Sequence, residues 1–321
     1  MTQFNMVEAI NSGLMNEMIS NPKVMLLGED IGTAGGVFRV TEGLQKKFGK
    51  ERVIDTPLAE SCIVGTSIGL AINGMVPVAE IQFSGFIPPA FDQIITHSGR
   101  IRNRSRGTYS VPMVIRAPYG GGIHAPEHHS ESMEAVLAHV PGIKVVIPST
   151  PYDAKGLIIS AIRDPDPVIF LEPKKIYRAY REDVPSKDYT IPLGMANIIQ
   201  EGNDVTVLSW GAMMHLTRKA VEELTGIELI DIRTISPLDI DTIIRSVKKT
   251  GRVVIVQEAP RNCGFASEII AVINDHALMH LEAPVERVTG FDTVVPLLKN
   301  EDRYFPDAKR ILYAINKVKS F

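Results

Sequence analysis

The stretch of sequence that decides the fold runs from residue 52 to residue 83: RVIDTPLAESCIVGTSIGLAINGMVPVAEIQF. Arg52–Thr56 and Val76–Phe83 have the apolar composition of buried strands, and Cys62–Ile72 between them has helical periodicity. Asn73-Gly74 predicts a turn that separates the helix from the second strand. Strand, helix and strand in this order predict parallel strands joined by a crossover helix.

The helix in this stretch is unusual because it lacks charge. Residues 61–79 contain no charged side chain, over a length that approaches that of a membrane span. Asn73-Gly74, Pro77 and several small polar residues argue against a span. A helix that is apolar on all sides is buried on all sides. We therefore expect it at the centre of a domain or at a subunit interface, with no membrane association.

Strand and helix patterns alternate on both sides of this stretch. The other strand candidates of the first half are Lys23–Asp30, Pro112–Ala117, Lys144–Pro148 and Val168–Glu172. The other helix candidates are Phe4–Ile19, Pro89–Arg102 and Tyr152–Arg163. Thr150–Asp153 has the form of a capping box, with proline at the first helical position. This alternation predicts a mainly parallel sheet with helices on both faces.

The pattern breaks between Glu172 and Leu193, where charged residues, tyrosine and proline are frequent and no period persists. We place a surface linker at residues 176–194, between a first domain at 1–175 and a second at 195–321. Strand candidates of the second domain are Val205–Trp210, Ile227–Ile232, Val253–Glu258 and Val285–Val288. Its helix candidates are Met213–Leu224, Asp239–Lys249, Ala266–Asn274 and Ala308–Lys317, with a second capping box at Ser236–Asp239. The predicted fold class is α/β with two doubly wound domains.

Composition excludes several classes of function. The pI is near 6.3 and no long basic run is present, so nucleic acid is not an expected partner. Cys62 and Cys263 are far apart in sequence, which favours a reducing compartment over a disulfide framework. Met1–Asn11 has neither the basic nor the apolar region of a signal peptide. We therefore expect a cytoplasmic chain.

The usual signatures of self-sufficient enzymes are absent from the sequence. There is no G-x-G-x-x-G after a strand, no Walker A loop, no G-x-S-x-G elbow and no zinc spacing. These absences argue against a dehydrogenase, kinase or hydrolase that works alone.

Two clusters of polar and aromatic residues follow predicted strands. Glu60 lies just after the first strand of the opening stretch, where open parallel sheets bind ligands. The alternative is a first-turn glutamate that the helix dipole favours. Gln82 and Phe86 follow the second strand and offer an amide and a flat ring for stacking on a heterocycle. The alternative is that Phe83 and Phe86 are simply core residues.

A third cluster is the loop Gly120–Ser130, with three glycines at its start and three histidines within six residues. Glycines let a backbone approach a ligand closely, and histidine carries protons near neutral pH. Two alternatives are a mobile surface loop with solvated histidines and metal binding by His124, His128 and His129.

Taken together, the clusters resemble the beta subunits of the decarboxylating components of 2-oxo acid dehydrogenases. The resemblance spans nearly the whole chain, and its ordered combination of motifs is specific. It is carried by Gly28–Asp30, Asp55–Glu60, Gly65–Ala71, Phe91–Ile94, His129-Ser130, Pro141–Val146, Ile232–Pro237 and Glu258–Pro260. The resemblance implies a pyrimidine-binding domain for thiamine diphosphate, followed by a transketolase C-terminal-like domain.

The resemblance also implies roles for individual residues. Glu60 would bind N1' of the cofactor's aminopyrimidine, with Leu58, Gln82 and Phe86 lining the pocket. His129 would be the active-site histidine near substrate and lipoyl group. Glu29, the other carboxylate at a strand end, is a further candidate for cofactor binding. A potassium site held largely by main-chain carbonyls maps onto Met113, Ala161, Ile162, Asp164 and Asp166, the last at a position that often holds Asn.

One absence bears on the partners. Enzymes of this kind usually hold magnesium and diphosphate through a Gly-Asp-Gly segment, which this chain lacks. The resemblance therefore implies that an alpha subunit supplies this half, in an assembly of two alpha and two beta chains. The acyl unit would pass from the 2-oxo acid to lipoyl groups of an acyltransferase component. The cofactor would supply the electron sink. The protein would orient the reacting groups and control proton transfer.

For the substrate, Phe170–Arg178 and Glu80–Phe83 look closest to the branched-chain type, with pyruvate and acetoin enzymes as alternatives. Two other readings remain open. One is a fragment of a single-chain transketolase or deoxyxylulose phosphate synthase. The other is a non-catalytic flavodoxin-like interaction module, which would leave Glu60, Phe86 and His129 unexplained as a set.

Overall fold

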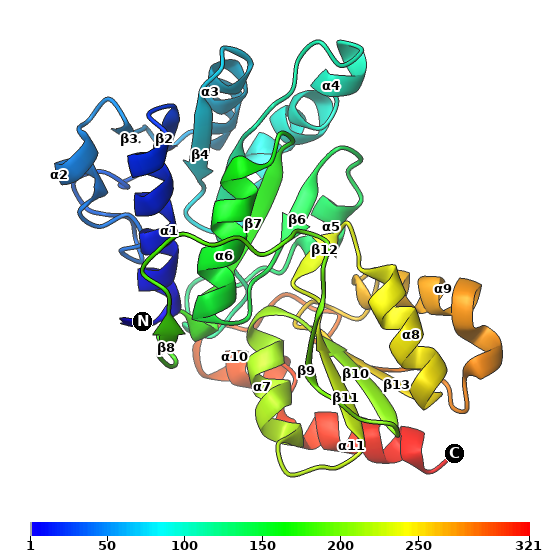
Figure 1. Ribbon diagram of the computed structural model, residues 1–321. Coiled ribbons are helices and arrows are strands. Elements are labelled where there is room, and N and C mark those ends of the chain that lie inside the picture. Colours follow the sequence, from blue (N-terminus) through cyan, green and yellow to red (C-terminus); the bar gives the residue numbers. More distant parts are fainter. Residues whose placement is uncertain (1) are drawn as a thin grey trace.

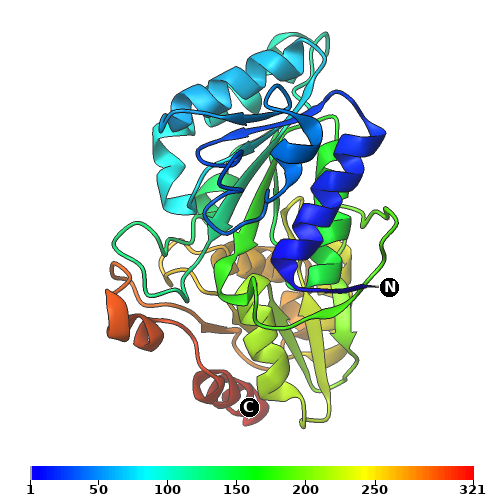
Figure 2. The same ribbon diagram turned by 90° about the vertical axis from the view of Figure 1, so that its left-hand side faces the viewer.

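The computed structural model describes residues 2–321 and contains sheets of seven, five and two strands. In Figure 1 the blue-to-green half of the chain forms the upper lobe, and the yellow-to-red part forms the lower right lobe. Figure 2, turned by 90°, shows the same separation. Each large sheet carries helices on both faces, so the predicted fold class of two doubly wound α/β domains is confirmed.

The seven-stranded sheet contains every strand predicted in the first half. Across the sheet the order is β12 (Thr234–Ser236), β6 (Lys144–Val146), β7 (Val168–Pro173), β5 (Val114–Tyr119), β4 (Val76–Glu80), β2 (Val24–Gly28) and β3 (Val53–Asp55). All neighbouring pairs are parallel except β12 with β6. Strand β12 comes from the second half of the chain and was not predicted, because three residues are too few to show alternation.

Alternating side chains give this sheet two apolar faces. In β7, Val168 and Phe170 join one core cluster, and Ile169 and Leu171 join the other. The first face is covered by α1 (Met6–Ser20) and α6 (Pro151–Arg163). The opposite face is covered by α3 (Glu60–Ile72) and the segment after β4. Both clusters continue into the second domain.

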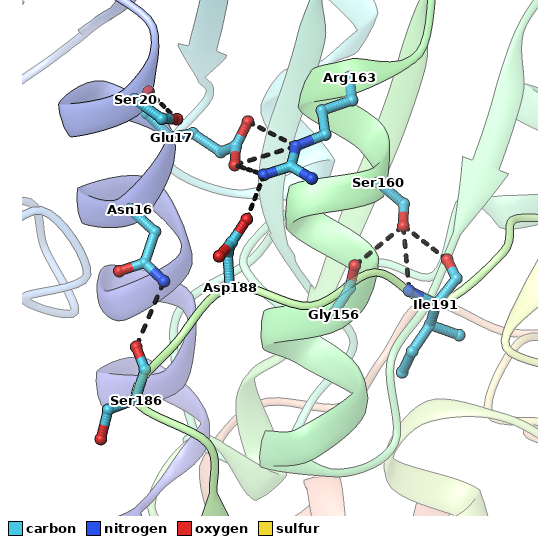
Figure 3. Close-up of polar contacts among 9 residues, drawn as sticks. All are labelled: Asn16, Glu17, Ser20, Gly156, Ser160, Arg163, Ser186, Asp188 and Ile191. Atoms are coloured by element: carbon cyan, nitrogen blue, oxygen red, sulfur yellow. Dashed lines mark hydrogen bonds and ion pairs between the residues drawn. The ribbon is translucent and has the colours of Figure 1, made fainter.

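Helices α1 and α6 pack closely and hold the predicted linker. A Cβ at Gly13 would lie 2.6 Å from Ile158 Cγ2, so glycine permits this approach. Arg163 of α6 binds Glu17 of α1 at 2.7 Å and Asp188 of the linker at 2.8 Å (Figure 3). The linker therefore lies along α6 rather than crossing free of the helices.

The five-stranded sheet has the order β14 (Glu286–Val288), β13 (Val253–Val256), β10 (Val205–Ser209), β11 (Ile227–Asp231) and β9 (Asn197–Gln200). Strand β9 is the antiparallel edge and was not predicted. One face is covered by α7 (Gly211–Val221) and α11 (Ala308–Lys319). The other is covered by α8 (Ile240–Thr250) and α9 (Ala266–Ala277). All four helices overlap their predicted ranges.

The remaining elements are short. A small antiparallel sheet pairs β1 (Thr2–Phe4) with β8 (Glu182–Val184). The other α-helices are α2 (Leu44–Phe48), α4 (Ile101–Arg104), α5 (Glu134–Ala138) and α10 (Glu301–Tyr304). Single turns of 3-10 helix are η1 (Ser84–Phe86), η2 (Pro88–Ala90), η4 (Lys174–Ile176), η5 (Leu278–His280) and η6 (Leu298–Asn300). The wider π-helix is η3 (Gln93–Ser98).

Two local predictions need correction. The helix expected over Pro89–Arg102 is broken into η2, η3 and α4, because Gly99 N–H bonds to the Ile94 carbonyl five residues back and widens the helix. The capping box expected at Ser236–Asp239 is wrong. The capping residue of α8 is Asp239, which accepts from Thr242 N–H, and not Ser236, which belongs to β12. At Thr150 half of the predicted capping box is present: Thr150 accepts from Asp153 N–H, whereas the Asp153 carboxylate binds Arg233 rather than the Thr150 backbone. None of the helices within residues 2–321 is long and apolar enough to cross a bilayer.

Candidate functional site

The carboxyl ends of three neighbouring strands meet at one edge of the seven-stranded sheet. Gly28, at the end of β2, is in register with the last residues of β3 and β4. Glu29 follows β2 directly, and the segments that lead to Glu60 and Gln82 follow β3 and β4. This is the edge at which open parallel sheets bind ligands.

Two of the predicted cofactor-binding carboxylates lie near each other at this edge. Burial, followed by the charges of Asp30 and Glu60, raises the pKa of Glu29. Glu60 is the first residue of α3, a position that the helix dipole also favours for a carboxylate. Leu58 is apolar yet 66% exposed. Glu29, Leu58 and Glu60 thus form an open rim, and their binding roles remain predictions.

The segment that carries Phe86 lies beside the start of α3. Ser61 Oγ donates to the Pro89 carbonyl at 2.5 Å, which joins the residue after Glu60 to the turn after Phe86. Phe83 is 6% exposed and belongs to the core side of this segment. Phe86 is half-buried and packs edge-on against Phe83, with ring centroids 5.5 Å apart. Of the two rings that the sequence offered, Phe83 is the core residue and Phe86 the partly exposed one.

His129 reaches this aromatic pair from a distant loop. Its ring centroid lies 4.4 Å from that of Phe83 and 5.0 Å from that of Phe86. Gly85 permits the approach, since a Cβ there would clash with the His128 carbonyl oxygen at 1.9 Å. The His129 Nδ1–H donates to the Glu127 carbonyl at 2.8 Å, so Nε2 is the nitrogen available for proton exchange.

The glycines of this loop have a different neighbour from the one expected. We expected Gly120, Gly121 and Gly122 to let the backbone approach a ligand. Instead, a Cβ at each would clash with a protein group: Glu258 Oε1 at 2.5 Å, Phe305 Cζ at 2.2 Å and Lys175 Cγ at 2.6 Å, respectively. The glycines therefore serve contact with the rest of the protein.

The three histidines of the loop do not converge. His124 Nε2 lies 3.0 Å from Asp302 Oδ2, whereas His129 packs against the aromatic pair. Within residues 2–321, no three His, Cys, Asp or Glu side chains gather in a way that could hold a metal ion.

The residues of the predicted potassium site lie near the end of α6 and in the loop before β7, with Met113 just before β5. Asp164 is paired with Lys144 at 2.6 Å, and Asp166 with Arg102 at 2.6 Å. The Met113 carbonyl accepts from Val168 N–H, and the Ala161 carbonyl from Asp164 N–H. Because both carboxylates already bind cationic side chains, main-chain oxygens are the ligands that a potassium ion would find here. The site remains a prediction.

Sequence reasoning missed a buried ionic network beneath the strand ends. Arg116 donates to Glu80 Oε2 at 2.7 Å and to Glu172 Oε1 at 2.6 Å, and Tyr177 Oη donates to Glu172 Oε2 at 2.5 Å. Burial raises the pKa of Glu80, although the charge of Arg116 opposes it. Charged residues inside apolar strands were the available signal, since buried charges need partners.

The comparisons with known proteins agree with this architecture. Residues 2–179 match the family model for the transketolase pyrimidine-binding domain, and residues 194–311 match that for the transketolase C-terminal domain. A solved structure described as a split-gene transketolase, inactive beta4 tetramer, has a TM-score of 0.81 at 21% identity and covers 99% of both chains. Fold and site edge thus define a two-domain protein of the transketolase class, which depends on thiamine diphosphate.

Relatives that match over the whole length of the chain identify its family within the transketolase class. The chain is 52% identical to the pyruvate dehydrogenase E1 component subunit beta of Acholeplasma laidlawii, over 99% of this chain and 98% of that one. It is 52% identical to the Bacillus subtilis protein of the same name over the full length of both, and 50% identical to that of Staphylococcus aureus over 97% of each. The chain belongs to the family of beta subunits of 2-oxo acid dehydrogenase decarboxylating components. These relatives bear the name pyruvate dehydrogenase, so the branched-chain type expected from Phe170–Arg178 is not supported.

Proposed function

We propose that this chain is the beta subunit of a pyruvate dehydrogenase. With an alpha subunit, it would catalyse oxidative decarboxylation of pyruvate and transfer of the acetyl unit to lipoyl groups of an acyltransferase component. The names of relatives that are 50–52% identical over the whole length support pyruvate over the branched-chain acids that we first expected. Acetoin remains the second candidate, on sequence resemblance alone.

The observation that carries the proposal is the arrangement at the sheet edge. A carboxylate at Glu60, an exposed apolar group at Leu58 and a half-buried ring at Phe86 are grouped by the strand ends and the Ser61 contact. This set fits an aminopyrimidine, which needs an acidic hydrogen-bond partner and apolar or aromatic walls. We assign Glu60, Leu58, Gln82, Phe86 and Glu29 to this half of the cofactor.

The roles of the protein groups follow from their chemistry. When bound, thiamine diphosphate supplies the electron sink for decarboxylation. Glu60 would share a proton with ring nitrogen N1', which makes it the residue that controls the protonation of the ring. Phe86 would orient the ring through its face. His129 would move a proton at Nε2, since its Nδ1 is held by the Glu127 carbonyl.

We further propose that the site is completed by an alpha chain in an assembly of two alpha and two beta subunits. The sequence has no Gly-Asp-Gly segment, so magnesium and diphosphate are assigned to the alpha chain. The two cysteines are free and exposed, which suits a reducing cytoplasm.

The test is to co-express the chain with its cognate alpha subunit and measure turnover of three substrates: pyruvate, acetoin and 3-methyl-2-oxobutanoate. An artificial electron acceptor reports oxidation of each substrate without the rest of the complex. We expect kcat/KM to be highest for pyruvate and activity to be lost when the alpha chain is omitted. A higher kcat/KM for the branched acid would overturn the substrate assignment, and turnover by the chain alone would overturn the shared site.

A further inference from the structure

We propose that Glu258 and Glu301, both from the second half of the chain, are positioning residues that fix the loop Gly120–Ser130 and with it the place of His129. The inference rests on the role proposed for His129 above. It concerns how the second domain takes part in a site whose other assigned residues lie on the first.

The two carboxylates bind consecutive main-chain groups of the loop. Gly121 N–H donates to Glu258 Oε1 at 2.5 Å, and Gly122 N–H donates to Glu301 Oε1. Glu258 is 2% exposed and Glu301 is 1% exposed. Hydrogen bonds from a backbone amide to a buried carboxylate are stronger than neutral ones, so these two contacts restrain the start of the loop.

Glu301 also reaches the far end of the loop. Ser130 Oγ donates to the same Glu301 Oε1 at 3.4 Å. One carboxylate oxygen therefore contacts the residue next to His129 and a glycine eight positions earlier. At the base, Gly120 N–H donates to the Glu131 carbonyl at 3.0 Å, and Ser84 Oγ donates to the same carbonyl at 2.7 Å. These contacts close the loop into a ring beside the Phe86 segment.

A buried cation balances the carboxylates. Lys174 is 3% exposed, its Nζ donates to the Gly120 carbonyl, and its charge interacts with both Glu258 and Glu301. Two carboxylates that faced one another without such a cation would repel and weaken the attachment. Two buried carboxylates and a buried lysine thus hold the start of the loop together.

The glycines are explained by the same contacts. A Cβ at Gly120 would lie 2.5 Å from Glu258 Oε1, and one at Gly121 would lie 2.5 Å from Glu301 Oε1. The backbone runs so close to the two carboxylates that a side chain would displace them. The first two glycines of the loop are thus required by attachment to the second domain, whereas Gly122 makes room for Lys175.

Attachment matters because His129 is next to the anchored Ser130. The imidazole packs against Phe86 at 5.0 Å between centroids. The residues of the loop form no helix or strand of their own, so these side-chain contacts are what restrain it. A shift of about 1 Å in a reacting group can cost ~100-fold in rate. Release of the loop from Glu301 should therefore lower turnover without touching the groups assigned to the cofactor.

The experiment compares Glu301→Ala, Glu301→Gln and Glu258→Ala in the complex assembled with the alpha subunit. Hydrogen–deuterium exchange of peptides covering residues 120–130 reports attachment directly. We expect roughly 10- to 100-fold faster loop exchange in the two alanine variants, the range for loss of one charge-assisted hydrogen bond. Glu301→Gln keeps an acceptor oxygen but loses the charge, so its loop should exchange faster than wild type and more slowly than that of Glu301→Ala. Pyruvate turnover should fall in parallel, with unchanged affinity for thiamine diphosphate.

The matched control is Glu228→Ala. Glu228 is a buried carboxylate of β11 that pairs with Lys249, so its loss is a comparable defect in the same domain without contact to the loop. It should lower thermal stability and leave loop exchange and turnover as in wild type. If Glu301→Ala does not fold, Glu301→Asp takes its place and is compared with Glu301→Gln. The aspartate carboxylate lies one methylene further from the loop.

Wild-type loop exchange in a folded Glu301→Ala or Glu301→Asp complex would overturn the attachment. Faster exchange with wild-type turnover would overturn the positioning role. An equal change in Glu228→Ala would mean that the loop responds only to general destabilisation, which also overturns it. Failure of the proposed function is separate, because it would be seen as absent pyruvate turnover in the wild-type complex while loop exchange stays readable.

Discussion

The ring of Phe86 lies edge-on against the imidazole of His129, with centroids 5.0 Å apart and planes inclined by 81°. The two residues are more than forty positions apart in sequence and follow different strands of the sheet. Their contact joins the group expected to orient the cofactor ring to the group expected to move a proton. The predictions below separate these roles from each other and from folding.

We predict that Glu60→Gln leaves folding and assembly intact, because the change is nearly isosteric at a half-exposed position. Affinity for thiamine diphosphate should fall modestly, since an amide still forms hydrogen bonds. Proton exchange at thiamine C2 should slow by ~100- to 10,000-fold, the usual contribution of a positioned acid–base group. Hydrogen–deuterium exchange at C2 in the assembled complex measures this. A wild-type rate with bound cofactor would exclude Glu60 and direct attention to Glu29.

We predict that Phe86→Ala weakens cofactor binding more than it lowers stability. A stacked ring contributes on the order of 1 kcal/mol beyond its buried area, and Phe86 is only half-buried. Phe83→Ala is the matched control, because that ring is 6% exposed and should affect mainly the melting temperature. Titration of thiamine diphosphate into the folded complex decides the matter. Equal losses of stability in the two variants, with unchanged affinity, would make Phe86 a core residue.

We predict that His129→Ala impairs acyl transfer to lipoyl groups more than cofactor binding, with a loss of about 100-fold or more in overall activity. The assay of the complete complex is run beside an artificial electron acceptor. His124→Ala is the control, since His124 pairs with Asp302 and is exposed at the other end of the loop. Wild-type rates for His129→Ala in both assays would remove it from the site.

We predict that Glu134→Gln changes the pH dependence of stability. Burial raises the pKa of this fully buried carboxyl to about 7, and neither Tyr119 nor Trp210 nearby meets hydrogen-bond geometry with it. The folded state therefore binds the proton more tightly than the unfolded chain. This contribution to stability is complete below about pH 4.5 and is lost as the pH rises to about 7.

The glutamine variant has no proton to lose, so its stability relative to wild type should improve by up to ~3 kcal/mol between pH 4.5 and pH 8. Melting temperatures of both complexes at pH 5, 6, 7 and 8 measure the trend. A difference that stays constant across this range would show that Glu134 keeps the same protonation state throughout.

Sequence patterns were sufficient for the framework of the fold. Period-two and helical periodicities are local properties of the sequence. Nearly all strands of the two large sheets, and the long helices that cover them, were therefore predicted close to where they occur. The place of Glu60 and Gln82 at strand ends followed from the same patterns, because the carboxyl ends of parallel strands meet at one edge. Short edge strands such as β12 and β9 escaped detection, since pairing with a distant partner rather than their own pattern makes them strands.

Contacts between distant segments were decided by the tertiary structure alone. Arg116, Glu80 and Glu172 are charged residues in otherwise apolar strands, a signal that the sequence interpretation did not use. Only the strand order β7-β5-β4 places the three side chains together. The glycines from Gly120 to Gly122 predicted a close backbone contact but did not show which group the backbone contacts. For Gly120 and Gly121 the neighbours include a pair of carboxylates, Glu258 and Glu301, more than 130 residues away, brought there by the packing of the second domain on the first. The physical reason is that side-chain partners depend on which elements become neighbours, and that depends on the burial of both sheets together rather than on any local stretch.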